Sequence, residues 1–160
     1  MPTMRSTPTE TVAAVYEAFG RGDVPFILDQ LSNDVSFDAD WIDNHAQAAG
    51  VEHLMPRRGP AQVADFFAVI GTWQVHDFQV LDLVGSGDRV VAEVRAEFTL
   101  PNGRRLADEE LHLWSFNADG KVTRFRHYVD TAKHLEAAIG RDPGGPLGAA
   151  SGCVSPRSTR

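Results

Sequence analysis

The alternation of apolar and polar residues divides the chain into a helical first half and a strand-rich second half. Apolar residues recur at helical spacing in 8–20 and in 59–70, whereas 73–130 follows a period of two. Turn sequences GSGD (85–88), PNGR (101–104) and NADG (117–120) separate four β-rich runs at 73–84, 89–100, 104–116 and 121–130. We therefore predict a four-stranded antiparallel meander, without a helix of more than two turns in that span.

Capping residues set the helix boundaries. Thr7 is a predicted N-cap, with Pro8 at the first helical position and Glu10 reaching back to the cap. The sequence also predicts a short helix after Asp23, a strand at 34–40, a helix from Gly59-Pro60 and a last helix at 131–140. Helices followed by a meander favour an α+β two-layer domain, in which the helices pack into the concave side of a strongly bent antiparallel sheet.

The turn sequences suggest which residues lie opposite each other. If Ser86-Gly87, Asn102-Gly103 and Asp119-Gly120 are the central pairs of two-residue turns, the opposed pairs are Phe78 with Arg95, Glu93 with His112, Arg95 with Glu110, and His112 with His127. A slip of one residue would turn a strand over.

This register produces one polar and one apolar face. The polar face would hold a row of Val80, Glu93, His112 and His127, a row of Phe78, Arg95, Glu110 and Val129, and the aromatic pair Trp114 and Phe125. The apolar face would hold Val90, Ala92, Val94, Ala96 and Phe98 with Leu111, Leu113 and Tyr128. Either the polar face meets water, as in many antiparallel sheets, or it lines a pocket while the apolar face meets a second subunit. The aromatic residues favour the pocket.

Composition narrows the function. The 160 residues suit one domain, and the net charge of −7 with no long Lys/Arg cluster disfavours nucleic acid and anionic membranes as partners. Cys153 is the one cysteine, and no run of 18 apolar residues occurs, so we expect a cytoplasmic protein. We expect residues 1–7 and the Gly/Pro-rich tail 141–160 to be disordered around a single domain at 8–140.

Several segments together resemble one superfamily. VYEAFGRGD, RGPAQVADFF, the pair GDRVVAEVRAEF and LHLWSF, and above all DGKVTRFRHYVDTAKHLEA resemble the nuclear-transport-factor-2-like superfamily. Within it the chain is most similar to the SnoaL-like, ketosteroid-isomerase-related group, over residues 8 to about 140. The resemblance implies a cone-shaped, strongly bent sheet around a cavity with an apolar entrance, and a homodimer formed through the outer sheet face.

The chemistry of the resembled enzymes carries over less well. Where limonene epoxide hydrolases place an Arg and two Asp, the aligned positions hold Glu93, Arg95 and His127. The oxyanion-donating Asp of ketosteroid isomerases aligns with His112, and Tyr16 and Asp38 lie near its other two catalytic positions. Polyketide cyclases of the SnoaL type use an acid–base carboxylate. None of these sets is reproduced in full.

The candidate catalytic residues are His112, His127 and Glu93, because imidazoles titrate near neutral pH and a carboxylate can orient one. Glu93 should then raise the pKa of His112. Candidate substrate-binding residues are Arg95, Glu110, Trp114, Phe125, Phe78, Phe37 and Tyr16. Tyr16 could equally be a core residue, and Arg95 could simply neutralise Glu110. The loop histidines His45 and His53 are expected at the surface.

We expect no cofactor. Glu93, His112 and His127 form a two-histidine, one-carboxylate set of the kind that binds iron or zinc, but the resembled group rarely uses metals, so no metal is expected. The sequence thus suggests a cofactor-free acid–base enzyme, of isomerase, cyclase, dehydratase or epoxide hydrolase type, for an apolar oxygenated metabolite such as a polyketide or terpenoid. The alternative is a non-catalytic ligand-binding or dimeric scaffold protein.

Overall fold

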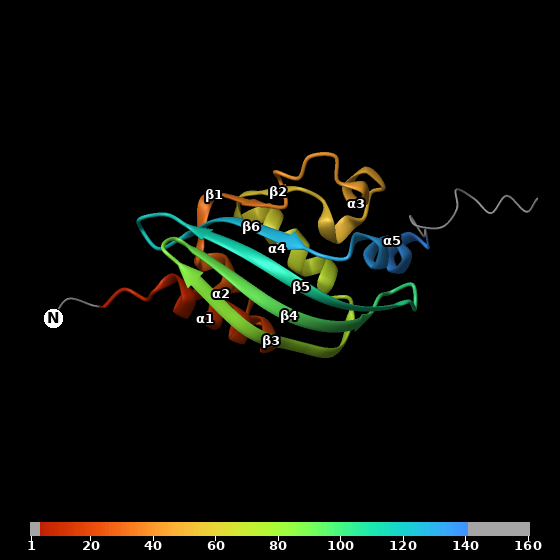
Figure 1. Ribbon diagram of the computed structural model, residues 1–160, viewed down its shortest axis with the longest axis horizontal. Helices are drawn as coiled ribbons and strands as arrows, with labels where there is room; N and C mark the ends of the chain where they lie inside the picture. The colour runs from red at the N-terminus through yellow and green to blue at the C-terminus, as the bar shows by residue number, and fades with distance from the viewer. Residues whose placement is uncertain (1–3, 141–160) are drawn as a thin grey trace, which may run out of the picture.

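A computed structural model describes residues 4–140 (Figure 1). Its helices are α1 (Pro8–Gly20), α2 (Val24–Asp29), α3 (His45–Ala48), α4 (Gly59–Ile70) and α5 (Thr131–Ile139), with a 3₁₀ turn η1 (Glu52–Leu54). Its strands are β1 (Leu31–Phe37), β2 (Arg57–Arg58), β3 (Gln74–Ser86), β4 (Arg89–Thr99), β5 (Arg105–Phe116) and β6 (Val122–Tyr128). These elements confirm the predicted α+β class. The expected disorder at 1–3 and 141–160, and Cys153, lie outside the described residues.

The predicted helix signals are confirmed by the caps. Thr7 and Glu10 form the reciprocal capping box, with the Thr7 backbone N–H donating to the Glu10 carboxylate at 3.1 Å. The Asp23 side chain accepts from the Phe26 N–H at 3.1 Å and so begins α2. Such caps satisfy backbone N–H groups that the first helical turn leaves free. They fix where α1 and α2 start.

The sheet is curved and unclosed, with the strand order β2-β1-β6-β5-β4-β3. Strands β3 to β6 form the predicted antiparallel meander, and β1 joins it parallel to β6. Helices α1, α2 and α4 cover one face, while α5 lies at the end of the sheet (Figure 1). The main core lies between α1, α2, α4 and the sheet, and includes Val12, Val15, Ile27, Val63, Phe37, Val90 and Trp114.

The predicted register between β4 and β5 is wrong by one residue. The Gly103 N–H donates to the Leu100 carbonyl at 2.9 Å, and Leu100 pairs with Arg104. The loop therefore has three residues, 101–103, instead of two. Proline suits the second position of a type I turn, and Gly103 takes the left-handed φ of 84° that closes such a loop with a bulge. In consequence Ala92 pairs with His112, and Glu93 pairs with Leu111.

The other two hairpins also differ from the prediction at their turns. The β3–β4 turn is centred on Gly87-Asp88, and the register shifts by one residue between Val80 and Asp82, so Phe78 pairs with Ala96 instead of Arg95. The β5–β6 loop also has three residues, 118–120, but the register shifts again between Ser115 and Phe116. The second shift cancels the first, so His112 pairs with His127 as predicted.

The corrected register rearranges the faces of the sheet. Val90, Ala92, Val94 and Ala96 are buried beneath the helices, on the same face as Glu110, His112 and Trp114. They therefore cannot form the outer subunit contact that the sequence suggested. Glu93 and Arg95 lie on the opposite, outer face and are exposed. Among residues 4–140, no helix has the length and apolar character needed to cross a membrane.

Candidate functional site

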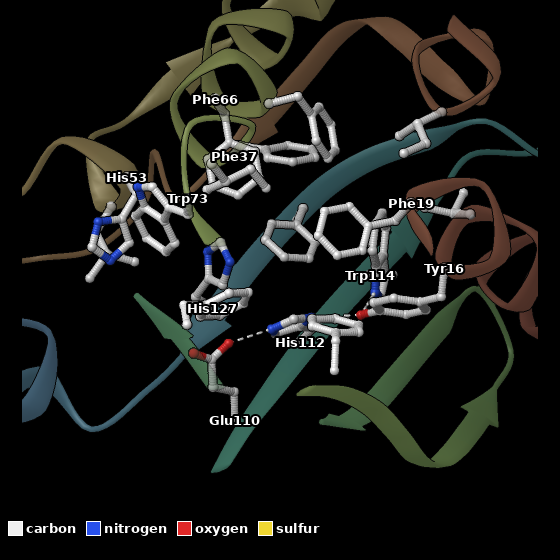
Figure 2. Close-up of a pocket in the computed structure, with 18 of the residues that line it drawn as sticks. Tyr16, Phe19, Phe37, His53, Phe66, Trp73, Glu110, His112, Trp114 and His127 are labelled. Atoms are coloured by element: carbon white, nitrogen blue, oxygen red, sulfur yellow. Dashed lines mark hydrogen bonds and ion pairs between the residues drawn. The ribbon is translucent and has the colours of Figure 1, made fainter. Parts of the chain in front are cut away.

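An internal cavity of about 80 Å³ lies between the helices and the inner face of the sheet (Figure 2). A cavity needs roughly 10–15 Å³ to hold one water molecule. This cavity is therefore large enough for a small organic group. Most of its wall is apolar and comes from α1, α2, β1, α4 and the meander; it includes Val15, Phe19, Ile27, Phe37, Phe66, Phe67, Ile70, Phe78, Phe98, Trp114 and Phe125. The polar groups are Tyr16, His53, Glu110, His112, His127 and His134.

His127 and Asp38 form a buried dyad. The parallel pairing of β1 with β6 places Phe37 beside Phe125, so Asp38 comes to lie beside His127. The His127 Nδ1 lies 2.6 Å from Asp38 Oδ2, and its backbone N–H donates to Asp38 Oδ1 at 2.8 Å. Both side chains are buried. Asp38 takes a left-handed φ of 52°, which turns the chain out of β1 and aims the carboxylate at β6.

The other ring nitrogen of His127 faces the cavity. A neutral His127 ring whose Nδ1–H donates to Asp38 has its lone pair on Nε2. No residue in the described part of the chain hydrogen-bonds to Nε2. The ring lies among Phe66, Phe125 and His112, with centroids 5.7, 4.5 and 4.9 Å away. An imidazole oriented by a carboxylate, with a free lone pair toward an apolar cavity, can accept a proton.

His112 is held at both nitrogens. Its Nδ1 lies 2.6 Å from the Tyr16 hydroxyl, which also accepts from the Trp114 indole N–H at 3.1 Å. Its Nε2 lies 2.8 Å from Glu110 Oε2. A neutral imidazole that accepts from Tyr16 and donates to Glu110 satisfies all of these contacts. His112 therefore has no free nitrogen for a ligand, although its ring forms part of the wall (Figure 2).

A third histidine neutralises the carboxylates at this end of the cavity. The His134 Nε2, on α5, lies 3.0 Å from Asp108 Oδ2 and 3.3 Å from Glu110 Oε1. Its Nδ1 lies 2.8 Å from His53 Nε2. His134 can thus donate from both nitrogens as an imidazolium, with His53 as a neutral acceptor.

The electrostatics agree with these assignments. Burial lowers the pKa of His134 but hydrogen bonds to Asp108 and Glu110 outweigh it and raise the pKa to about 9. Burial, together with the charge of His134, lowers the pKa of His53 to about 2.

The pKa shifts of the central network have the same origin. Burial lowers the pKa of His112 despite its bond to Glu110, and burial raises the pKa of the Tyr16 phenol. For Glu110, burial is opposed by hydrogen bonds from His112 and His134, which hold its pKa well below the usual range. At neutral pH the network therefore holds an ionised Glu110, a charged His134 and a neutral His112.

Most of the predicted site residues meet at this cavity. It is lined by His112, His127, Glu110, Trp114, Phe125, Phe78, Phe37 and Tyr16. Glu93 and Arg95 are not there, because the β4–β5 loop turns their side chains outward; Arg95 instead bonds to Glu109 at 3.4 Å. The predicted effect of Glu93 on His112 is therefore wrong, and Glu110 occupies that role. His45 is exposed as expected, whereas His53 is buried.

Sequence reasoning missed four polar residues of this site: Asp38, Asp108, His53 and His134. The sequence places Asp38 near a catalytic position of the resembled isomerases but does not pair it with His127. The parallel β1–β6 pairing has no connecting turn from which a register could be predicted. Asp108 shares the inner face with Glu110 and His112 through strand alternation, and was recoverable once the register was right. His134 lies one helical turn after Asp130, but the docking of α5 against β5 has no local sequence signal.

Two sets of residues have donor atoms close enough for a divalent cation: Glu110, His112 and His127, and Asp108, Glu110 and His134. Within each set, atoms lie within 4.8 Å of one another. In both sets hydrogen bonds already join a carboxylate to an imidazole, at 2.8 Å in the first and 3.0 Å in the second. Protons thus satisfy these donors, and a cation would have to displace them.

Comparisons with known proteins identify the family. The family model described as SnoaL-like domain matches residues 12–125. The chain belongs to the SnoaL-like family. The predicted resemblance to the nuclear-transport-factor-2-like superfamily is thereby confirmed. A search of curated proteins finds no match.

Solved structures share the fold. An NTF2-like protein of unknown function from Burkholderia pseudomallei K96243 is 26% identical, with a TM-score of 0.67 over 84% of this chain and 99% of that one. TerC, co-crystallised with polyporic acid, is 26% identical, with a TM-score of 0.65 over 82% and 98%. The epoxide hydrolase/cyclase-like enzyme SalBIII, of pyran ring formation in the polyether salinomycin, is 19% identical, with a TM-score of 0.59 over 76% and 89%.

Proposed function

We propose that this SnoaL-like protein is an acid–base enzyme that moves a proton on a small, apolar, oxygenated molecule such as a polyketide or terpenoid. The observation that carries the proposal is the buried Asp38–His127 dyad, whose remaining nitrogen opens to an apolar cavity. The cocrystal of TerC with polyporic acid supports an oxygenated organic ligand for a cavity of this family.

The proposed step begins at His127. Its Nε2 lone pair takes a proton from the carbon next to a substrate carbonyl, so that the C–H bond breaks, an N–H bond forms and the electron pair moves to the carbonyl oxygen. Asp38 stabilises the imidazolium and keeps Nε2 turned toward the cavity. Return of the proton to another carbon gives isomerisation. Its delivery to a neighbouring hydroxyl breaks the C–O bond and gives loss of water, as the enolate electrons re-form the carbonyl and make a C=C bond. In ring closure the enolate carbon bonds to an electrophilic carbon of the same molecule, and the proton passes to the oxygen that takes up the electron pair there. The apolar wall strengthens these interactions by excluding water.

Proton exchange tests this proposal without the natural substrate. 2-Tetralone is an apolar ketone whose acidic protons exchange with D₂O, and ¹H NMR follows the loss of their signal. We expect the wild type to accelerate exchange, and His127→Gln to reduce the acceleration by about 10²-fold or more, as for loss of a positioned base. Asp38→Asn should cost at least about tenfold: its amide oxygen would accept from the His127 backbone N–H, and the amide N–H₂ would then face Nδ1, where it cannot accept a proton.

Glu93→Gln is the matched control. It removes a carboxylate of β4 whose side chain lies on the outer face, so the exchange rate should not change. An unchanged rate in His127→Gln would refute the proposed base.

A second candidate function, a non-catalytic binder, is favoured by the complete pairing of His112 and Glu110. Saturable binding of 2-tetralone without exchange would support that alternative.

A further inference from the structure

A groove between α1 and β3 borders the cavity. The two spaces share six residues, which form a collar around their junction: Tyr16, Phe19, Phe67, Ile70, Trp73 and Phe78. The groove measures about 570 Å³, against about 80 Å³ for the cavity. Much more space thus lies outside the collar than beside His127.

Side chains form the collar. The ring centroids of Phe19 and Phe78 are 4.9 Å apart, and those of Phe19 and Phe67 are 6.4 Å apart. These side chains are only partly buried, in contrast to the fully buried core beneath them. Rotamer changes of exposed or half-exposed rings need no backbone movement. A ligand can therefore extend across the collar when the rings turn aside.

The groove is apolar. Beyond the collar its wall includes Ala13 and Glu17 from α1, and Val75, Val80 and Leu83 from β3. Among the described residues that line it, Glu17 carries the only charge, and Glu17 is exposed to solvent. Val75 is 51% exposed. The part of a ligand that lies here must be uncharged and apolar.

A second groove makes a useful contrast. It lies between α4 and the β4–β5 loop and shares just His53 and Trp73 with the cavity. Its wall includes Glu52, Arg57 and Asp65, so it offers charges of both signs. An apolar ligand group prefers the first groove, because charged walls would lose hydration without gaining partners.

We propose that the α1–β3 groove is a tail subsite: the substrate is an elongated apolar molecule whose carbonyl-bearing end enters the cavity and whose uncharged tail lies between α1 and β3. This inference rests on the proposed function for the reacting end. It adds that the groove, through residues such as Val75 and Ala13, sets the length of the preferred substrate.

A series of methyl ketones from 2-butanone to 2-nonanone tests the subsite. Both the dissociation constant, by calorimetry, and the rate of α-proton exchange in D₂O are measured. For the wild type we expect affinity to rise by up to roughly fourfold for each added methylene. Val75→Glu places a charge in the groove and should flatten this rise, with a larger loss for 2-nonanone than for 2-butanone. Ala68→Glu, on α4 beside the second groove, is the control and should keep the rise.

The two measurements separate the two proposals. A rising affinity without any exchange refutes the acid–base function and keeps the tail subsite. Exchange without dependence on chain length, or an equal flattening by Ala68→Glu, overturns the tail subsite. Val75→Glu could also change the oligomeric state, as measured by light scattering, while its affinity for the ketones still rises with chain length as in the wild type. That result would assign the groove to a protein contact and overturn the tail subsite.

Discussion

At the residue scale, the site depends on how three histidines with the same intrinsic chemistry are made different. His127 keeps one free nitrogen, His112 has both nitrogens bonded, and His134 lies between two carboxylates. Environments that separate the pKa values of neighbouring groups are what acid–base catalysis needs. The sequence predicted such a separation, but between His112 and His127. The structure places the raised pKa on His134.

His134 should make stability depend on alkaline pH. Its folded pKa of about 9 exceeds the unfolded value of about 6.5. Its contribution is therefore fully present below pH 6.5 and is lost as pH rises through 9. The shift corresponds to at most about 3 kcal/mol.

The check is urea unfolding of the wild type and His134→Gln at pH 6 and pH 10. We expect the difference in unfolding free energy between the two proteins to shrink at pH 10, because His134 is neutral there. Comparing the two proteins removes the effects of lysines and tyrosines that titrate in both. A difference that is equal at both pH values would contradict an imidazolium at this position.

At the element scale, the sequence predicted the helices and strands well, because caps and periodicity act over a few residues. Thr7, Asp23 and the turn sequences all lie where they were expected. The β4–β5 register failed because Asn102-Gly103 suits a two-residue turn, while Pro101 just before it favours a three-residue one. The three-residue loop places Glu93 and Arg95 on the outer face of the sheet, away from the predicted site. Burial of Val90, Ala92 and Val94, which only the tertiary structure reveals, shows which choice is right.

The left-handed conformation of Gly103 in the β4–β5 loop can be tested directly. Gly103→Ala should destabilise the protein by about 1–2 kcal/mol, because alanine tolerates the φ of 84° poorly. The site has open space around a Cβ, so backbone strain is the sole cause. Gly20→Ala is the matched control: it also has open space, but it lies in α1 with an ordinary φ, and should be neutral or stabilising. Equal thermal stabilities of the two variants would contradict the left-handed conformation of Gly103.

At the scale of the whole molecule, the corrected register changes which residues could join two subunits. Val90 and Val94 are needed for the core and are fully buried. The outer face still exposes Leu111 and Tyr128, which pair across β5 and β6 and are 46% and 44% exposed, as well as Val84. We therefore keep the homodimer through the outer sheet face as a prediction, but with these residues as its apolar centre.

Two lysine substitutions distinguish the core from this outer face. Leu111→Lys puts a charge where the predicted dimer excludes water, so a folded monomer should result, with a wild-type circular dichroism spectrum and half the mass by light scattering. Val94→Lys buries an unpaired ammonium in the core and should unfold the chain, because the desolvation cost of several kcal/mol is a large part of the stability of such a domain. A wild type that is monomeric at micromolar concentration would refute the dimer. A Leu111→Lys protein that remains dimeric would place the contact on another surface.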